Sequence, residues 1–189
     1  MPERPYHHGN LPRAVLEVTV AAITEHGPSG VRLRDVARRA GVAHTSVTHH
    51  FGDKAGLLGQ VAAEGYRRLA EELRGVEQLE GGFLELGVAY VRFAVHNRPY
   101  FEVMFRPELY RADDPGVADA RAVTFALLNG GAAEIADDPS DPTTTAIAGW
   151  SLVHGLATLW LGGALPSHIG DDPEDITRRV AAELGRRDG

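Results

Sequence analysis

Hydrogen-bonding side chains crowd into one short stretch of the sequence, residues 44–50, which holds three histidines, two threonines and one serine. Lys54 follows one helical turn later. Hydroxyl and imidazole groups form hydrogen bonds with base edges and phosphates, and the methyl group of threonine can touch the methyl group of thymine. The stretch therefore has the chemistry of a nucleic-acid contact, provided that it lies on the surface.

Other chemistries find less support in the sequence. The adjacent pairs His7-His8 and His49-His50 would diverge by about 100° on a helix, and no His-x-x-x-His or Glu-x-x-His pairing occurs. The chain has no cysteine, and it lacks a nucleophile elbow, a phosphate loop and a dinucleotide fingerprint. We therefore expect no metal site, no cofactor and no enzymatic activity.

The charge of the chain is unevenly distributed. Its 189 residues carry a formal net charge of −7. Residues 1–56 hold seven Lys and Arg against five Asp and Glu, together with six of the nine histidines, whereas the remainder has a net charge of −9. Either the surface charge is scattered by chance, or a mildly basic head and an acidic body have separate functions. No secretory signal pattern opens the sequence, which favours the cytoplasm.

The positioning elements are predicted to be helices throughout. Alternation with a period of two never persists, and helix start and stop signals recur along the chain. Asn10 is the expected cap of the first helix, and the Asp-Pro pairs at 114–115, 141–142 and 172–173 fit a cap followed by proline at the first helical position. The fold is therefore predicted to be all-α, with helices at 11–25, 33–40, 44–50, 53–73, 83–96, 100–105, 116–136, 143–165 and 174–186.

Residues 33–40 and 44–50 form a compact helix-turn-helix unit, because Gly41 permits a tight turn between them. Val47 and Phe51 lie four residues apart and should anchor the second helix. The polar side chains should then face outward, as a protein surface that reads DNA or as a merely solvated helical corner. In the first case Thr45, Ser46, His50 and Lys54 would position the duplex, while His44, Thr48 and His49 would contribute more to reading it.

Three segments, at residues 6–11, 31–42 and 49–58, resemble the TetR family of bacterial transcriptional regulators. The resemblance covers residues 8–60 and implies an all-helical homodimer with an N-terminal DNA-binding head and a C-terminal ligand-binding body. Arg32 and Ala43 stand where the family usually has a hydroxyl cap, and Thr48 where it often has tyrosine. With Arg32 included, the predicted DNA-contacting residues are Arg32, His44, Thr45, Ser46, Thr48, His49, His50 and Lys54.

A second resemblance lies in the body. Trp150-x-x-x-His154-Gly155 and residues 97–101 look like the TetR subgroup with a Trp-His-Gly-type C-terminal domain. Its aromatic residues would be a plain core or line a ligand cavity, and His154 would be a satisfied core histidine or a polar anchor. The predicted ligand-binding residues are Phe93, Phe101, Met104, Phe105, Trp150 and His154.

The sequence thus predicts a helix-turn-helix DNA-binding domain at 1–56 and a ligand-binding and dimerisation domain at 57–189. Residues 146–165 carry no formal charge, but four glycines and no flanking Lys or Arg favour a helix buried against other helices over a membrane span. We expect residues 143–165, with 174–186, to form the dimer surface. The function that we expect is that of a homodimeric repressor that binds a pseudo-palindromic operator and is released by a small-molecule ligand. The alternatives are a small-molecule binding protein with a vestigial head, and an activator or a ligand-independent regulator.

Overall fold

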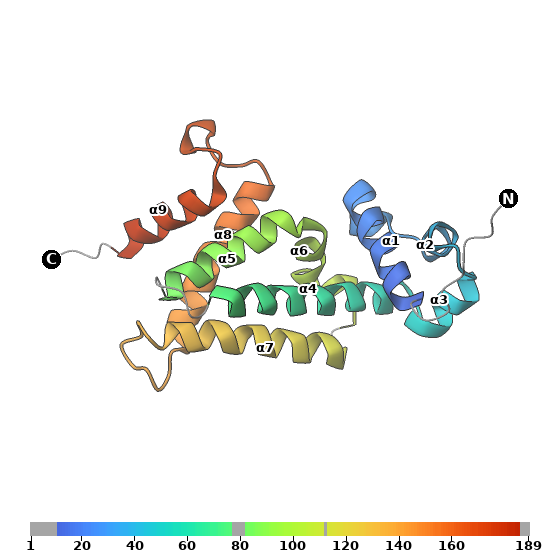
Figure 1. The fold of residues 1–189 in the computed structure, drawn as a ribbon, viewed down its shortest axis with the longest axis horizontal. Coiled ribbons are helices and arrows are strands. Elements are labelled where there is room, and N and C mark those ends of the chain that lie inside the picture. The colour runs from blue at the N-terminus through green and yellow to red at the C-terminus, as the bar shows by residue number, and fades with distance from the viewer. Residues whose placement is uncertain (1–10, 77–81, 112, 186–189) are drawn as a thin grey trace. The chain divides into compact units, whose positions relative to one another are not determined.

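The computed structural model describes residues 11–76, 82–111 and 113–185, and within these ranges its regular elements are helices only (Figure 1). The predicted all-α fold is therefore confirmed. The predicted cap Asn10 and the last residue of the predicted final helix, Arg186, lie outside the described residues. The α-helices are α1 (Leu11–His26), α2 (Leu33–Ala40), α3 (His44–Phe51), α4 (Lys54–Val76), α5 (Gly82–His96), α6 (Arg98–Met104), α7 (Pro115–Ala132), α8 (Thr143–Leu161) and α9 (Pro173–Gly185).

The chain divides into two compact units. The first unit comprises the residues up to Glu64 together with the separate segment Pro99–Ala118. The second comprises Gly65–Arg98 and the residues from Asp119 onward. Helix α4 therefore contributes its first half to one unit and its second half to the other.

The first unit is built around α1, α2 and α3. Val15, Thr19, Ala22 and Ile23 form the buried face of α1. Val18, at the neighbouring position, is only half-buried. Thr19 takes the inner position instead, because its hydroxyl donates to the Val15 carbonyl at 2.7 Å and is thereby satisfied.

The turn between α2 and α3 depends on Gly41, as predicted. Gly41 has φ 68° and ends α2 in the left-handed conformation, which costs a residue with a Cβ atom. The next amide, that of Val42, donates to the Ala37 carbonyl at 3.0 Å and closes the turn. Val36 and Ala37 of α2 and Val47 and Phe51 of α3 are buried, so that the two short helices pack on their apolar faces.

The second unit is centred on α5, which is buried on most of its circumference. Helices α8 and α9 both pack on α5 (Figure 1). The Arg178 guanidinium of α9 forms a bidentate ion pair with Glu85 of α5, at 3.0 and 2.9 Å. Among the described residues, no helix is long and apolar enough to span a membrane.

The predicted pattern of an aspartate cap followed by proline at the first helical position is confirmed for two of the three Asp-Pro pairs. Asp114 and Asp172 each accept backbone N–H groups of the first turn, of α7 and α9 respectively, and a proline follows at the first helical position. Helix α8 begins at Thr143, as predicted, but Pro142 precedes the helix instead of occupying its first position. Asp141 receives only a 3.4 Å contact from the Thr143 amide.

Some predicted boundaries need correction. Helix α7 ends at Ala132 rather than residue 136, and α8 ends at Leu161 rather than residue 165. Gly162-Gly163 follows α8 and stops it, with Gly163 at φ 64°. Asp53 precedes α4 as its cap, accepting the Gly56 amide at 2.9 Å, instead of being its first residue.

Candidate functional site

Helix α3 presents its polar side chains outward, as predicted. Val47 is fully buried and Phe51 is 6% exposed, so these two residues hold the inner face. His44, Thr45, His49 and His50 are exposed, whereas Ser46 and Thr48 are half-buried. The imidazole and hydroxyl groups are thus available at one surface, which is the condition that a nucleic-acid contact requires.

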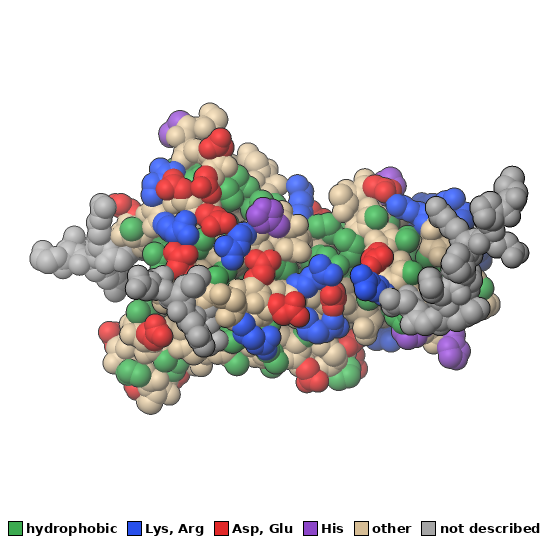
Figure 2. Space-filling view, viewed as in Figure 1, with side chains coloured by type: hydrophobic (Ala, Val, Ile, Leu, Met, Phe, Trp, Pro, Cys, Tyr) green, Lys and Arg blue, Asp and Glu red, His purple; other side chains and the backbone are tan. Residues whose placement is uncertain are grey.

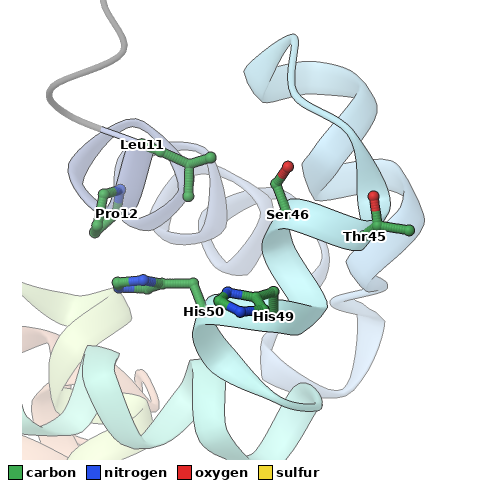
Figure 3. Close-up of a pocket in the computed structure, with 6 residues that line it drawn as sticks. All are labelled: Leu11, Pro12, Thr45, Ser46, His49 and His50. Carbon is green, nitrogen blue, oxygen red and sulfur yellow. The ribbon is translucent and has the colours of Figure 1, made fainter.

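A shallow pocket of about 440 Å³ lies between α3 and the first turn of α1 (Figure 3). Its walls carry imidazoles and hydroxyls from α3, and no carboxylate of the described residues lines it. Leu11 and Pro12, at the start of α1, form the other wall. The lining residues are Leu11, Pro12, Thr45, Ser46, His49 and His50.

Thr48 directs its hydroxyl back to its own helix. The Oγ1 atom donates to the carbonyls of His44 and Thr45, at 3.2 and 3.1 Å. Because the single hydroxyl proton is engaged there, Thr48 offers its surroundings an acceptor oxygen and a methyl group. A tyrosine at this position would have offered a phenol further from the backbone.

Lys54 is the first residue of α4, and its ammonium group is already held within the first unit. The Nζ atom donates to the Ser29 carbonyl at 2.8 Å. Partial burial lowers the pKa of Lys54, and the nearby Arg32 guanidinium lowers it further. Arg32 itself is exposed. Two cationic side chains therefore lie close together beside α3.

Helices α2 and α3 begin without a side-chain cap, as expected from the lack of a hydroxyl residue at either position. Neither Arg32 at the start of α2 nor Ala43 at the start of α3 forms a side-chain cap. Basic side chains cover the outer face of α2 instead (Figure 2). Arg39 is bound to Glu25 of α1 by two hydrogen bonds of 2.8 Å, which leaves Arg34 and Arg38 as the more outward cations.

The predicted ligand-binding residues fall into both compact units. Phe101, Met104 and Phe105 belong to the first unit, where the rings of Phe101 and Phe105 lie 5.0 Å apart. Phe93, Trp150 and His154 belong to the second unit. Phe93, Phe101 and Met104 are buried, and Phe105 is half-buried.

Trp150 and His154 meet through Tyr90 of α5, a residue that the sequence reasoning did not single out. The indole Nε1–H of Trp150 donates to the Tyr90 hydroxyl at 3.1 Å, and the same hydroxyl lies 2.9 Å from Nδ1 of His154. Burial raises the pKa of Tyr90 and lowers the pKa of His154. The phenol of Tyr90 between apolar neighbours in the sequence was the only available signal, since the pairing of α5 with α8 is a property of the fold.

A larger apolar groove of about 670 Å³ lies among α5, α7, α8 and α9 of the second unit. Of the six predicted ligand-binding residues, Trp150 alone lines it. The described side chains that line it are uncharged. They are Phe83, Leu84, Gly87, Leu128, Ile135, Thr145, Ala148, Gly149, Trp150, Leu152, Val153, Thr177, Ala181 and Ala182.

A metal-binding cluster is not found in the part of the chain that the structure describes. A helix-turn-helix with an outward polar face, joined to a helical unit with an apolar groove, defines the class of DNA-binding transcriptional regulators.

Comparison with known proteins agrees with this class. Residues 15–61 match the family model of bacterial regulatory proteins of the tetR family, and residues 83–184 match the tetracyclin repressor-like C-terminal domain. The chain belongs to the TetR family of transcriptional regulators. The Trp-His-Gly subgroup stays a prediction.

Relatives extend over nearly the whole chain. The HTH-type transcriptional regulator BetI of Escherichia coli is 26% identical over 187 residues, covering 90% of this chain and 92% of its own. A protein of unknown function from Rhodococcus sp. RHA1 is 30% identical, with a TM-score of 0.81 and coverage of 97% and 98%. LfrR of Mycobacterium smegmatis, a TetR-like regulator solved in complex with proflavine, shares the fold at 16% identity, with a TM-score of 0.63 and coverage of 92% and 93%.

Proposed function

We propose that this TetR-family regulator is a cytoplasmic repressor that binds a pseudo-palindromic operator as a homodimer and leaves it when a small molecule binds. The observation that carries the proposal is the outward polar face of α3 above its buried anchors Val47 and Phe51. A helix of eight residues fits a major groove, which is about 12 Å wide. In this proposal residues 1–56 bind DNA, and residues 57–189 bind the ligand and dimerise.

The contacts to DNA divide into two groups. Thr45, Ser46, His50 and Lys54, with Arg32, hold phosphates, because the first three line the pocket at the start of α1 and the other two carry positive charge. His44, Thr48 and His49 read base edges. Since the hydroxyl proton of Thr48 is engaged within α3, its methyl group is the part that we expect to meet a thymine methyl.

Dimerisation is proposed to use α8, with α9 beside it. Helix α8 carries no charged residue, and its exposed face includes Ile147 and Leu159, which are 46% and 47% exposed. Ala148 and Ser151 lie between them on the same face and are small enough for close helix approach. Large apolar side chains left in water on one face favour a partner surface.

The effector site is proposed to lie in the second unit around Trp150 and His154. The groove beside Trp150 has the volume of a small-molecule site, for which about 300–1,000 Å³ is usual. LfrR, with the same fold, was solved with a small aromatic molecule. Release from DNA requires that the ligand binds more tightly to a conformation that fits the operator less well.

Selection of bound fragments from random duplex DNA tests the proposal. We expect enrichment of a pseudo-palindrome whose half-sites are separated by about one helical turn or a multiple of it. Affinity for the selected duplex should fall steeply with salt. Fragments without symmetry would contradict the homodimer. Failure to enrich any sequence would favour a small-molecule binding protein with a vestigial head.

A further inference from the structure

The corner between α3 and α4 is contacted by a distant part of the chain. Residues Pro99–Ala118 belong to the same compact unit as the helix-turn-helix, although they follow it by more than forty residues. The corner consists of Gly52, which ends α3, and Asp53, which caps α4. Whatever fixes this corner also fixes the end of α3.

The two oxygens of the Asp53 carboxylate accept hydrogen bonds from different partners. Its Oδ1 atom accepts the Gly56 amide at 2.9 Å, and its Oδ2 atom accepts Nη2 of Arg111 at 2.9 Å. The hydrogen bond from the Gly56 amide has the larger effect on the pKa of Asp53, and together with the bond from Arg111 it holds that pKa below its usual range. The same Arg111 nitrogen lies 3.5 Å from the position that a Cβ atom would take at Gly52. Arg111 therefore lies against both residues of the corner.

A second, tightly packed contact anchors the segment that carries Arg111. Asp114 caps α7, and its Oδ2 atom lies 2.9 Å from the position of a Cβ atom at Gly59 of α4. The Cβ atom of Tyr110 lies 3.7 Å from that position. Tyr110 is buried, and its hydroxyl donates to the Met104 carbonyl at 2.8 Å. The residues on either side of Arg111, Tyr110 and Asp114, are thus packed against the second turn of α4.

We propose that Arg111 is a positioning residue for DNA recognition, holding Asp53 so that the α3–α4 corner keeps α3 in its binding orientation. The inference rests on the proposed function and adds to it a residue far from the helix-turn-helix in sequence. Helix α3 has only eight residues, and a helix of that length does not keep its shape or direction without neighbours. Loss of the Arg111 contact leaves α3 less pre-organised, and ordering it again on DNA lowers affinity.

The test uses full-length variants and the duplex selected from random DNA, with affinity measured by fluorescence anisotropy. Arg111→Gln removes the charge, and Asp53→Asn keeps an oxygen for the Gly56 amide while removing the partner of Arg111. Both side chains are more than half exposed, so that an effect of about two- to four-fold on the dissociation constant per head is expected from each. The double variant should be no weaker than either single variant, and Arg111→Lys should recover most of the affinity.

Arg106→Gln is the matched control. Arg106 lies on the same segment and forms an exposed ion pair with Glu108 at 2.9 Å. We expect this variant to bind like the wild type. The slope of log affinity against log salt should stay unchanged in Arg111→Gln, because a positioning residue contacts no phosphate.

Three results would overturn the positioning role: wild-type affinity in Arg111→Gln, additive losses in the double variant, or a shallower salt slope, which would make Arg111 a direct phosphate contact. If the wild-type chain itself fails to bind selected DNA, the proposed function fails and the inference falls with it. Binding by the wild type with unchanged variants refutes the inference alone.

Discussion

At the scale of single residues, Lys54 has a structural contact in addition to the DNA contact that we predict for it. The sequence placed it beside the start of α4 as a phosphate ligand, and the structure adds the 2.8 Å hydrogen bond to the Ser29 carbonyl. An ammonium group has three donors, so that the bond leaves two for a phosphate. Lys54 is therefore expected to serve the DNA contact and to tie the α1–α2 connection to α4.

Replacement of Lys54 by alanine should weaken binding to all DNA sequences by a similar factor. The salt slope should become shallower by about 1.8 for the dimer, since each of the two heads loses one phosphate contact and each contact contributes about 0.9 in duplex DNA. Affinity for the selected duplex and for random DNA, each measured over a range of salt, checks both expectations. A change in base preference at one operator position would mean that Lys54 reads sequence rather than backbone.

His154 makes the stability of the protein depend on pH. Burial lowers its pKa in the folded state, so that the unfolded state binds the proton more readily. The stabilisation is present above the usual imidazole value of about 6.5 and is lost as the pH falls from there through the lowered folded value. Urea denaturation at pH 8 and pH 5.5 should show a smaller loss of stability in His154→Gln than in the wild type. An equal loss in both would show that His154 contributes nothing to this dependence.

At the scale of elements, the helix-turn-helix was predictable because its determinants are local. Gly41, the apolar spacing of Val47 and Phe51, and two of the Asp-Pro caps act within a few residues of themselves. The contact of Arg111 with Asp53 and the chain from Trp150 through Tyr90 to His154 join residues 58 to 64 positions apart. Such pairings depend on how helices pack, and no short sequence pattern encodes them.

The left-handed turn at Gly41 gives a prediction for the element itself. Gly41→Ala should lower the free energy of unfolding by about 1 kcal/mol, because alanine pays for the positive φ. Gly75→Ala is the control, since Gly75 lies inside α4 with open space at its Cβ position and should be neutral or stabilised by up to about 1 kcal/mol. Chemical denaturation of the three proteins checks the difference. Equal stability of the two variants would contradict the role assigned to Gly41.

At the scale of the whole molecule, binding to both half-sites of a pseudo-palindrome requires two copies of the chain. The uncharged α8 is the surface that we expect to bring them together. Ile147→Asp should convert the dimer to a monomer, because an aspartate in an apolar interface must be desolvated without a partner. Val123→Asp on α7 is the matched control, as Val123 is 43% exposed and lies outside the proposed interface. Sedimentation velocity measures both.

A dimeric Ile147→Asp protein would remove α8 from the interface. If the variant is monomeric, its affinity for a full pseudo-palindrome should fall to that for a single half-site, because the two heads no longer bind as one. Retention of full operator affinity by a monomer would contradict the homodimeric reading of DNA.

The outward face of α3 is expected to distinguish one DNA sequence from another. The direct measurement is the ratio of affinities for the selected duplex and for random duplex, in the wild type and in the double variant His44→Ala, His49→Ala. Both side chains are exposed, so that the variant should fold normally. We predict that the ratio falls at least about ten-fold, since a base contact contributes about 1–3 kcal/mol of discrimination. An unchanged ratio in a folded variant would show that sequence is read elsewhere on the protein.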